Sequence, residues 1–149
     1  MAQIIPEPLS QKPGIQLIKA GSLEMVPLGE TYMCAGLKSN IIDVPISNQK
    51  EQLTMGHFEM RPSPNDFPFF YEYLEVKTVV SGTIVVKDEE QKRYEAHVGD
   101  VFIFTPPYLV IFLAESDGRA VYMGHRGAEP SFLPGYQGGP INTPGINDK

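Results

Sequence analysis

Two stretches near the middle of the chain decide its fold: Phe69-Phe-Tyr-Glu-Tyr-Leu-Glu-Val-Lys-Thr-Val-Val-Ser-Gly82 and His97-Val-Gly-Asp-Val-Phe-Ile-Phe-Thr-Pro-Pro107. Both are rich in β-branched and aromatic residues, which favour strands, and each is closed by residues that interrupt a strand. Gly99-Asp100 is a turn signal inside the second stretch. The two stretches therefore predict a pair of strands to which the rest of the chain adds further sheet.

Short strand-forming runs separated by turn residues continue on both sides of this pair. The run 53–61 alternates like a half-buried strand, with Met55, His57, Glu59 and Arg61 on one side. The other expected strands span 15–18, 22–26, 31–35, 71–80, 83–87, 93–97, 101–104, 109–114 and 119–125, and 38–50 is either an edge strand or a loop. Strands this short, with a turn every 8 to 12 residues or so, predict an all-β antiparallel sandwich or barrel.

The two ends of the chain differ from its middle in composition. Residues 1–14 hold three prolines, which fix the backbone and remove donors, so this segment is expected to be an extended N-terminal arm. Residues 15–126 are expected to form one β-barrel domain, since 149 residues fit a single core. Residues 127–149 are rich in Gly and Pro and are expected to form an extended strap or a disordered tail.

Composition narrows the range of partners. The net charge is −6 and the 12 basic residues are scattered, so no nucleic-acid partner is expected. Cys34 is the only cysteine, which excludes an internal disulfide, and the first residues lack the pattern of a signal peptide. No segment offers the roughly 20 apolar residues that a membrane span requires. We therefore expect a cytoplasmic protein with no membrane partner.

The spacing of a few residues resembles a known family. Glu75, followed by six residues and Gly82, and then Gly99-Asp100 opening a strand that ends at Pro106-Pro107, resemble the two signature motifs of the cupin superfamily. This resemblance implies a double-stranded β-helix, the jelly-roll barrel of RmlC-like proteins. Cupins commonly pair their sheets into dimers, so the resemblance also implies a homodimer.

The metal motifs of the family are degenerate in this chain. Counted from Glu75, the histidine positions of the family fall on Phe69 and Tyr71, or on Pro68 and Phe70, and near Val110. None of these residues is a histidine. A single carboxylate holds a transition metal poorly without imidazole or thiolate beside it. We therefore expect no cofactor and no standard cupin metal site, while a divalent metal at a non-standard site stays open.

Within the superfamily, the chain looks like the ethanolamine-utilization cupins of the EutQ type. The similarity lies in Met55-Gly-His-Phe-Glu-Met, in Phe67-Pro-Phe, and in Tyr73-Leu-Glu-Val-Lys-Thr-Val-Val-Ser-Gly-Thr-Ile. Those proteins also keep an aromatic residue and the Glu while losing the histidines. The resemblance implies a role near ethanolamine breakdown in a bacterial microcompartment, where such proteins are associated with acetate or acetyl-phosphate metabolism.

Strand alternation places Tyr71, Tyr73 and Glu75 on one face. If Glu75 points into the barrel, the two phenols do as well, and together they line a pocket for a small polar metabolite. Burial among aromatic rings would raise the pKa of Glu75, which suits a general acid or base. Glu75 is therefore the candidate catalytic residue, with Tyr71 and Tyr73 as ligand contacts. In the alternative, Glu75 faces solvent or pairs with a basic residue such as Lys77 or Arg126.

His57 and Glu59 complete the set of candidate ligand-binding residues. They share one face of the run 53–61 and could approach Glu75 across the sheet, as an acid–base pair or as part of a non-standard metal site. A polar stripe that faces solvent explains the same two residues more simply.

Three functions stay open at this point. The first is a cupin that binds a small polar metabolite, with acid–base chemistry at Glu75. The second is a metal-dependent lyase, isomerase or dioxygenase that recruits His57, Glu59 and Tyr71 around Glu75. The third is an interaction protein whose terminal arms bind a partner while the barrel is inert.

Overall fold

The computed structural model describes residues 3–48 and 50–144. Over this part of the chain we find nine strands, one short 3-10 helix and no α-helix. The strands are β1 (Val26–Pro27), β2 (Lys38–Ser47), β3 (Leu53–Arg61), β4 (Phe67–Tyr71), β5 (Glu75–Lys87), β6 (Arg93–Ala96), β7 (Val101–Phe104), β8 (Tyr108–Phe112) and β9 (Asp117–Gly124), and the helix is η1 (Pro130–Phe132). None of the described residues forms a helix long and apolar enough to cross a membrane.

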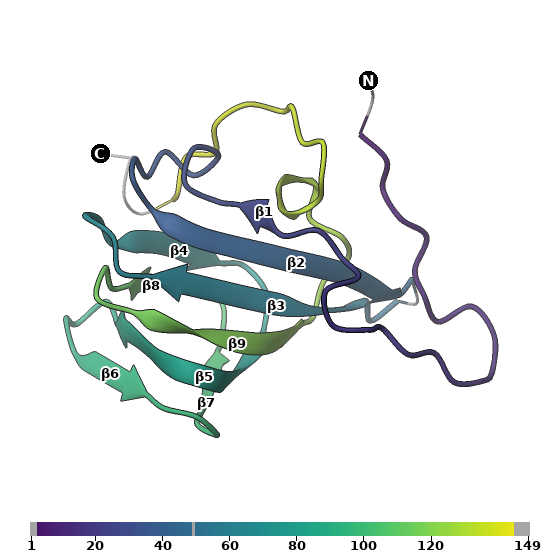
Figure 1. Ribbon diagram of the computed structural model, residues 1–149, viewed down its shortest axis with the longest axis horizontal. Coiled ribbons are helices and arrows are strands. Elements are labelled where there is room, and N and C mark those ends of the chain that lie inside the picture. Colours follow the sequence, from purple (N-terminus) through teal and green to yellow (C-terminus); the bar gives the residue numbers. More distant parts are fainter. Residues whose placement is uncertain (1–2, 49, 145–149) are drawn as a thin grey trace.

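The strands form two layers that share β5 (Figure 1). In the first layer the order β1-β2-β3-β9 leads to the first half of β5, and β7 lies on the other side of that half. In the second layer the end of β5 pairs with β6 and β8, and β8 pairs with β4. Every pair is antiparallel. The expected all-β jelly-roll fold is therefore confirmed.

β5 is one strand where the sequence predicts two, over 71–80 and 83–87. Its register against β9 shifts between Val79 and Ser81, and Gly82 follows with a φ of 63°. A side chain at Gly82 would collide with the backbone of Asp117. The predicted turn is thus a bulge, which bends the strand so that its two halves belong to different layers.

The N-terminal segment is longer than the predicted arm. The expected strands at 15–18 and 31–35 do not form, and strand pairing starts only at Val26. The segment 28–34 instead closes turns on itself, with Tyr32 N donating to Leu28 O and Cys34 N donating to Gly29 O. The chain before β1 loops away from the barrel beside the end of β2 (Figure 1), where Leu9 N donates to Pro45 O.

Residues 127–144 fold back over the barrel, and we call them the C-terminal strap (Figure 1). Phe132 and Leu133 are buried, with 3% and 2% of their surface exposed. Ile141 N donates to Thr31 O over 2.7 Å. The predicted strap is thus packed against the barrel as far as residue 144. Residues 145–149 of the predicted tail, like Met1 and Ala2 of the predicted arm, lie outside the described residues.

Candidate functional site

Glu75 opens β5 and points into the barrel, where 3% of its surface is exposed. Tyr71, the last residue of β4, donates a hydrogen bond of 2.7 Å to Glu75 Oε2. Lys77, two residues along the same face of β5, places Nζ 3.3 Å from the same oxygen. The Tyr73 ring, in the turn between the two strands, lies 5.5 Å from the Tyr71 ring. The structure therefore brings Glu75, Tyr71 and Tyr73 together, but from two strands and the turn between them and not from one face of a single strand over 71–80. Their roles stay predictions.

Lys77 is enclosed by aromatic rings as well as paired with Glu75. Its Nζ lies 4.0 Å from the ring centroid of Phe58, 4.8 Å from that of Phe112 and 5.4 Å from that of Tyr122. Ring faces attract a cation, more strongly where water is excluded. Burial lowers the pKa of Lys77, and the nearby Glu75 carboxylate opposes that shift.

Tyr71 acts in this cluster as a neutral donor. Burial raises its pKa well above the ordinary value, and the neighbouring Glu75 raises it further. The phenol therefore keeps its proton at neutral pH, in keeping with the bond that it donates to the Glu75 carboxylate. Glu75, Lys77 and Tyr71 together offer an acceptor, a cationic donor and a neutral donor within one apolar interior.

A second buried charge cluster lies beside the first. Asp43 on β2 accepts two bonds from Arg126, of 2.8 and 3.0 Å, and a third from Tyr122 Oη. The Arg126 guanidinium stacks on Tyr73 at 4.8 Å and on Phe132 of the strap at 5.2 Å. Burial and the bond to Asp43 raise the pKa of Tyr122 well above its ordinary value. The cluster joins the barrel to the start of the strap.

The cavity next to Glu75 is small. It has a volume of about 20 Å³ and is lined by Glu75, Lys77, Tyr71 and Tyr73, with Phe69 and Phe132 among the rings around it. A space of this size holds about one water molecule. The rings of Phe69 and Phe132, whose centroids are 6.1 Å apart, therefore leave no room for a metabolite in this conformation.

His57 and Glu59 do not join this cluster, so the expected approach to Glu75 is wrong. In β3 the buried residues are Phe58 and its even-numbered neighbours, and His57 and Glu59 lie on the opposite, outer face. Glu59 there accepts a bond of 3.0 Å from Asn40 and lies 3.6 Å from Arg61. Burial lowers the pKa of His57, and the Arg119 charge lowers it further. The outer position agrees with the simpler alternative, a polar stripe on the sheet surface.

The donors around Glu75 do not fit the metal of the cupin family. The family's histidine positions carry Phe69, Tyr71 and Val110, none of which offers an imidazole. The Lys77 ammonium is already beside the Glu75 oxygen and would repel a metal dication. Among the described residues we find no group of three or more His, Cys, Asp or Glu side chains that could hold a metal ion.

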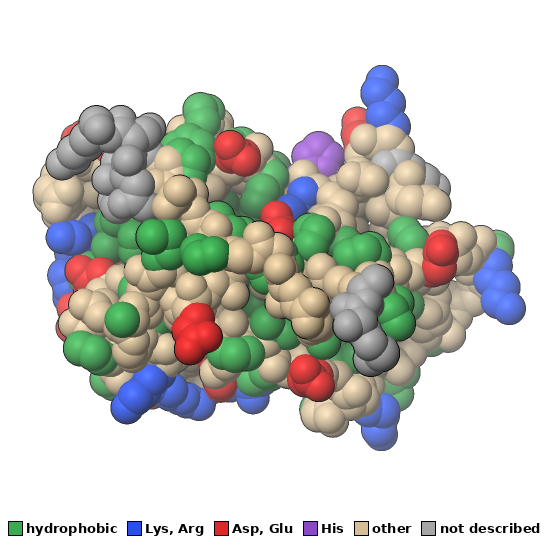
Figure 2. All heavy atoms as spheres, turned by 90° about the horizontal axis from the view of Figure 1, so that it is seen from above, with side chains coloured by type: hydrophobic (Ala, Val, Ile, Leu, Met, Phe, Trp, Pro, Cys, Tyr) green, Lys and Arg blue, Asp and Glu red, His purple; other side chains and the backbone are tan. Residues whose placement is uncertain are grey.

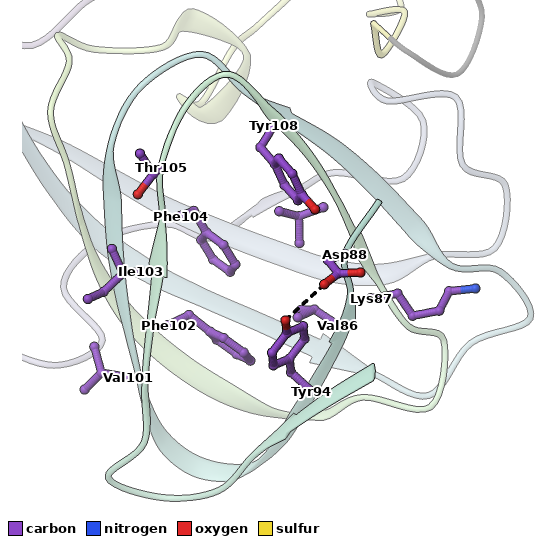
Figure 3. Close-up of a pocket in the computed structure, with 11 residues that line it drawn as sticks. Val86, Lys87, Asp88, Tyr94, Val101, Phe102, Ile103, Phe104, Thr105 and Tyr108 are labelled. Atoms are coloured by element: carbon purple, nitrogen blue, oxygen red, sulfur yellow. Dashed lines mark hydrogen bonds between the residues drawn. The ribbon is translucent and has the colours of Figure 1, made fainter. Parts of the chain in front are cut away.

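A larger pocket opens on the other side of the Tyr71 ring. It has a volume of about 440 Å³ and lies between β7 and the pair β6 and β8 (Figure 3). Phe104 lines it, and the Phe104 ring stacks on the Tyr71 ring with centroids 4.6 Å apart. These two rings thus form a wall between the pocket and the cavity beside Glu75.

The surface that Figure 2 presents carries no concentrated basic patch. Lys and Arg side chains lie mainly around the outline of this face, and hydrophobic side chains are interspersed between them. Such a distribution offers no track for a phosphate backbone on this side of the molecule.

No protein-family model and no curated protein matches the chain. Solved structures do match it. A crystal structure from Salmonella typhimurium LT2, provisionally named ethanolamine utilization protein Q, is 18% identical with a TM-score of 0.64, and the match covers 80% of this chain and 93% of that one. The polyketide cyclase RemF from Streptomyces resistomycificus is 11% identical with a TM-score of 0.58, covering 78% and 83%. An RmlC-like cupin from Shewanella frigidimarina NCIMB 400 is 13% identical with a TM-score of 0.57, covering 80% and 97%. At these identities the matches show that the fold is shared.

Proposed function

From the cupin fold of this chain, we propose that it is a metal-independent cupin that binds a small polar metabolite beside Glu75 and uses Glu75 as an acid–base group. The observation that carries the proposal is the Glu75–Lys77 ion pair, held with Tyr71 in an apolar interior. Such a pair costs more free energy to bury than an apolar pair of the same size, so it is weak support for stability. A buried ionisable group whose pKa is shifted by burial and by a specific charge partner, as that of Lys77 is, is typical of functional sites.

The three side chains divide the chemistry among them. In this proposal the Glu75 carboxylate takes a proton from the bound ligand, while its Oε2 stays held by the Tyr71 phenol and the Lys77 ammonium. The Lys77 ammonium stabilises negative charge that develops on the ligand, which is the electrostatic part that a metal plays in other cupins. The neutral Tyr71 phenol orients the carboxylate. In this proposal the Lys77 ammonium is the counter-ion of the Glu75 carboxylate, and no metal is required.

Ligand entry requires the strap to move, because the cavity holds about one water. Phe132 is the ring of the strap that lines the cavity, and it contacts Phe69 and the Arg126 guanidinium. Displacing this ring would connect the cavity with the outside. Binding is then coupled to opening of the strap, and the ligand is expected to be small.

The test measures the binding of small polar probes to the protein by calorimetry. The name of the Salmonella neighbour suggests ethanolamine as one probe, and acetate and acetyl phosphate are further ones. Glu75→Gln is expected to lose the binding, while Glu59→Gln, the same change on the outer face of β3, keeps it. Phe132→Ala is expected to tighten binding, since the closing ring is gone. Equal binding by wild type and Glu75→Gln would contradict the proposal.

Metal content is a separate test of the metal-independent part. Protein purified without chelator is expected to hold far less than one equivalent of iron, zinc or manganese per chain. About one equivalent that disappears in Glu75→Gln would overturn this part and favour a metal-dependent enzyme instead.

A further inference from the structure

The pocket of about 440 Å³ between β7, β6 and β8 has the size and lining of a ligand site in its own right. Binding pockets for small molecules commonly span about 300 to 1,000 Å³ and combine apolar walls with a few placed polar groups. Phe102, Phe104, Val86 and Val110 supply the apolar walls here. Figure 3 shows the two phenylalanine rings facing the pocket, whereas the side chains of Val101 and Ile103 point away from it.

The polar groups gather at one end of this pocket. Asp88 lies there between Tyr94 and Tyr108 (Figure 3). Asp88 Oδ1 accepts bonds of 2.9 Å from the backbone amides of Glu90 and Lys92, and Oδ2 accepts a bond of 3.0 Å from Tyr94 Oη. The carboxylate is thus fixed in place before any ligand arrives. These hydrogen bonds also lower the pKa of Asp88, so it is charged at neutral pH.

Tyr108 adds a donor next to that carboxylate. Its Oη accepts a bond of 3.0 Å from the Glu89 amide, and this bond does not use the phenol's own proton. The side chain of Lys87 points away from the pocket (Figure 3). Lys92 places Nζ 4.9 Å from the Tyr94 ring centroid, so this ring face already attracts a cation. The polar end therefore offers a fixed anion and an adjacent phenol donor, with the Lys92 ammonium already over the Tyr94 ring.

We propose that this pocket binds a small molecule with an aromatic or similarly bulky apolar body and a protonated amine, with the amine at Asp88 and the body against Phe102 and Phe104. A carboxylate can accept further bonds besides that from Tyr94, because its two oxygens offer about four acceptor positions. The inference does not depend on the function proposed for Glu75, since the stacked rings of Phe104 and Tyr71 separate the two cavities.

The test compares three probes that share a phenyl ring and differ in charge: phenethylamine, 2-phenylethanol and 3-phenylpropionate. Each is titrated into the full chain, and affinity and site are read from backbone amide shifts in NMR spectra. Phenethylamine is expected to bind more tightly than the alcohol, and the anion most weakly. The shifts are expected at Asp88, Tyr94, Phe102 and Tyr108. Shifts that centre elsewhere, or affinities independent of charge, would overturn the proposal.

Two variants sharpen the result. Asp88→Asn keeps an acceptor for the backbone amides but removes the charge, and it is expected to weaken phenethylamine binding about tenfold or more while leaving 2-phenylethanol nearly unchanged. Glu90→Gln, on the same turn, is the matched control and is expected to bind like wild type. Amide shifts at Asp88 and Tyr108, and not at Glu75 and Tyr73, separate this site from the one beside Glu75. An unchanged phenethylamine affinity in Asp88→Asn would overturn the assignment of the amine to Asp88.

Discussion

The Glu75 carboxylate and the Lys77 ammonium lie 3.3 Å apart, and about 4% of each side chain is exposed. Removing one member of such a pair leaves the other charge buried without a counter-ion. We expect Lys77→Met to lower the free energy of unfolding by about 3 to 5 kcal/mol. The double variant Glu75→Gln/Lys77→Met buries no charge and should lose less than the two single variants together. Urea denaturation of the four proteins gives this coupling free energy.

The matched control is a surface pair. Arg93 lies 3.0 Å from Glu115, with about half of each side chain exposed. Exposed pairs contribute little because water and salt screen them, so Arg93→Met should leave the urea midpoint unchanged. A Lys77→Met variant as stable as Arg93→Met would mean that the Lys77 charge is not needed in the interior.

Strand alternation explains what the sequence could predict about single residues. Over the predicted strand 71–80 it places Tyr71 and Glu75 on one face; the structure does join them, but from the end of β4 and the start of β5. Alternation defines the two faces of a strand but not which of them points into the barrel. The predicted approach of His57 and Glu59 to Glu75 failed for this reason, because both residues lie on the outer face. In β3 the face with Phe58 and Met60 is the more apolar one, and this contrast could have decided the question. Asp43 was missed because 38–50 was not assigned as a strand, so its orientation had no basis.

At the scale of elements, Gly82 decides how β5 serves both layers. Its φ of 63° is unfavourable for other residues, and a Cβ would meet the backbone of Asp117 and Gly118. Gly82→Ala therefore adds a steric clash to backbone strain and should cost more than the roughly 1 to 3 kcal/mol of a strained backbone alone. The measurement is the free energy of unfolding.

Gly99 is the matched control for that substitution. It also has a positive φ, of 95°, but a Cβ there would find nothing within 4 Å. Gly99→Ala should therefore show the backbone strain without the clash, and so the smaller loss. Equal losses in the two variants would mean that the close approach of β5 to Asp117 is not what requires glycine.

The strap is the element through which the proposed ligand must pass. Phe132 fixes it by packing on Tyr32, Phe69 and the Arg126 guanidinium. Phe132→Ala removes this packing, so strap amides such as Leu133 and Ile141 should exchange hydrogen faster while those of β3 and β9 stay protected. Hydrogen exchange followed by mass spectrometry reads both regions at once. Uniform acceleration over the barrel would instead mean that the strap is part of the global core.

The sequence predicted the central elements well and the ends poorly. The strands predicted at 53–61 and 101–104 have the same bounds as β3 and β7, because turn residues mark their ends in the sequence. The run 31–35 failed because its backbone is satisfied by local turns, which a short apolar run does not reveal. Burial of Phe132 and Leu133 depends on contacts with distant strands, so composition alone suggested only a strap or a disordered tail.

At the scale of the whole molecule, buried tyrosines set the behaviour at high pH. Burial raises the pKa of four of the seven tyrosines: Tyr32, Tyr71, Tyr73 and Tyr122. A raised folded-state pKa means that their stabilisation is complete below the unfolded pKa, roughly 10, and is lost as the pH rises above it. Lys77, whose pKa is lowered, acts in the opposite direction below about pH 10.5, but it is one group against four.

We therefore expect the free energy of unfolding to fall steeply above about pH 10. Phenolate absorbance should show the four buried tyrosines ionising only when the protein unfolds. Urea denaturation across the alkaline range, with absorbance recorded in parallel, checks both statements. Seven tyrosines that titrate together in the folded protein would contradict the burial of this cluster.

One row of side chains on the outer face of the first layer is apolar across several strands, beside the polar stripe that holds His57 and Glu59. The strand register aligns Ile103 of β7 with Val76 of β5, then with Met123 of β9 and Met55 of β3. Ile103 is 68% exposed and Met123 is 50% exposed. The N-terminal segment covers this layer only loosely, since Ile18 and Leu23 border a space of about 530 Å³ above it. A contiguous row of exposed apolar side chains is a candidate surface for contact with another molecule.

We propose that a second copy of the chain covers this face, as a homodimer. A twofold axis places the same surface on both partners, so the apolar row of one chain can pack against that of the other. Sedimentation equilibrium should give twice the chain mass of 16.5 kDa for wild type. Ile103→Glu/Met123→Glu buries charges at the contact and should give the mass of one chain. Val98→Glu, at an exposed turn outside this row, is the control and should stay dimeric; a monomeric wild type would refute the interface.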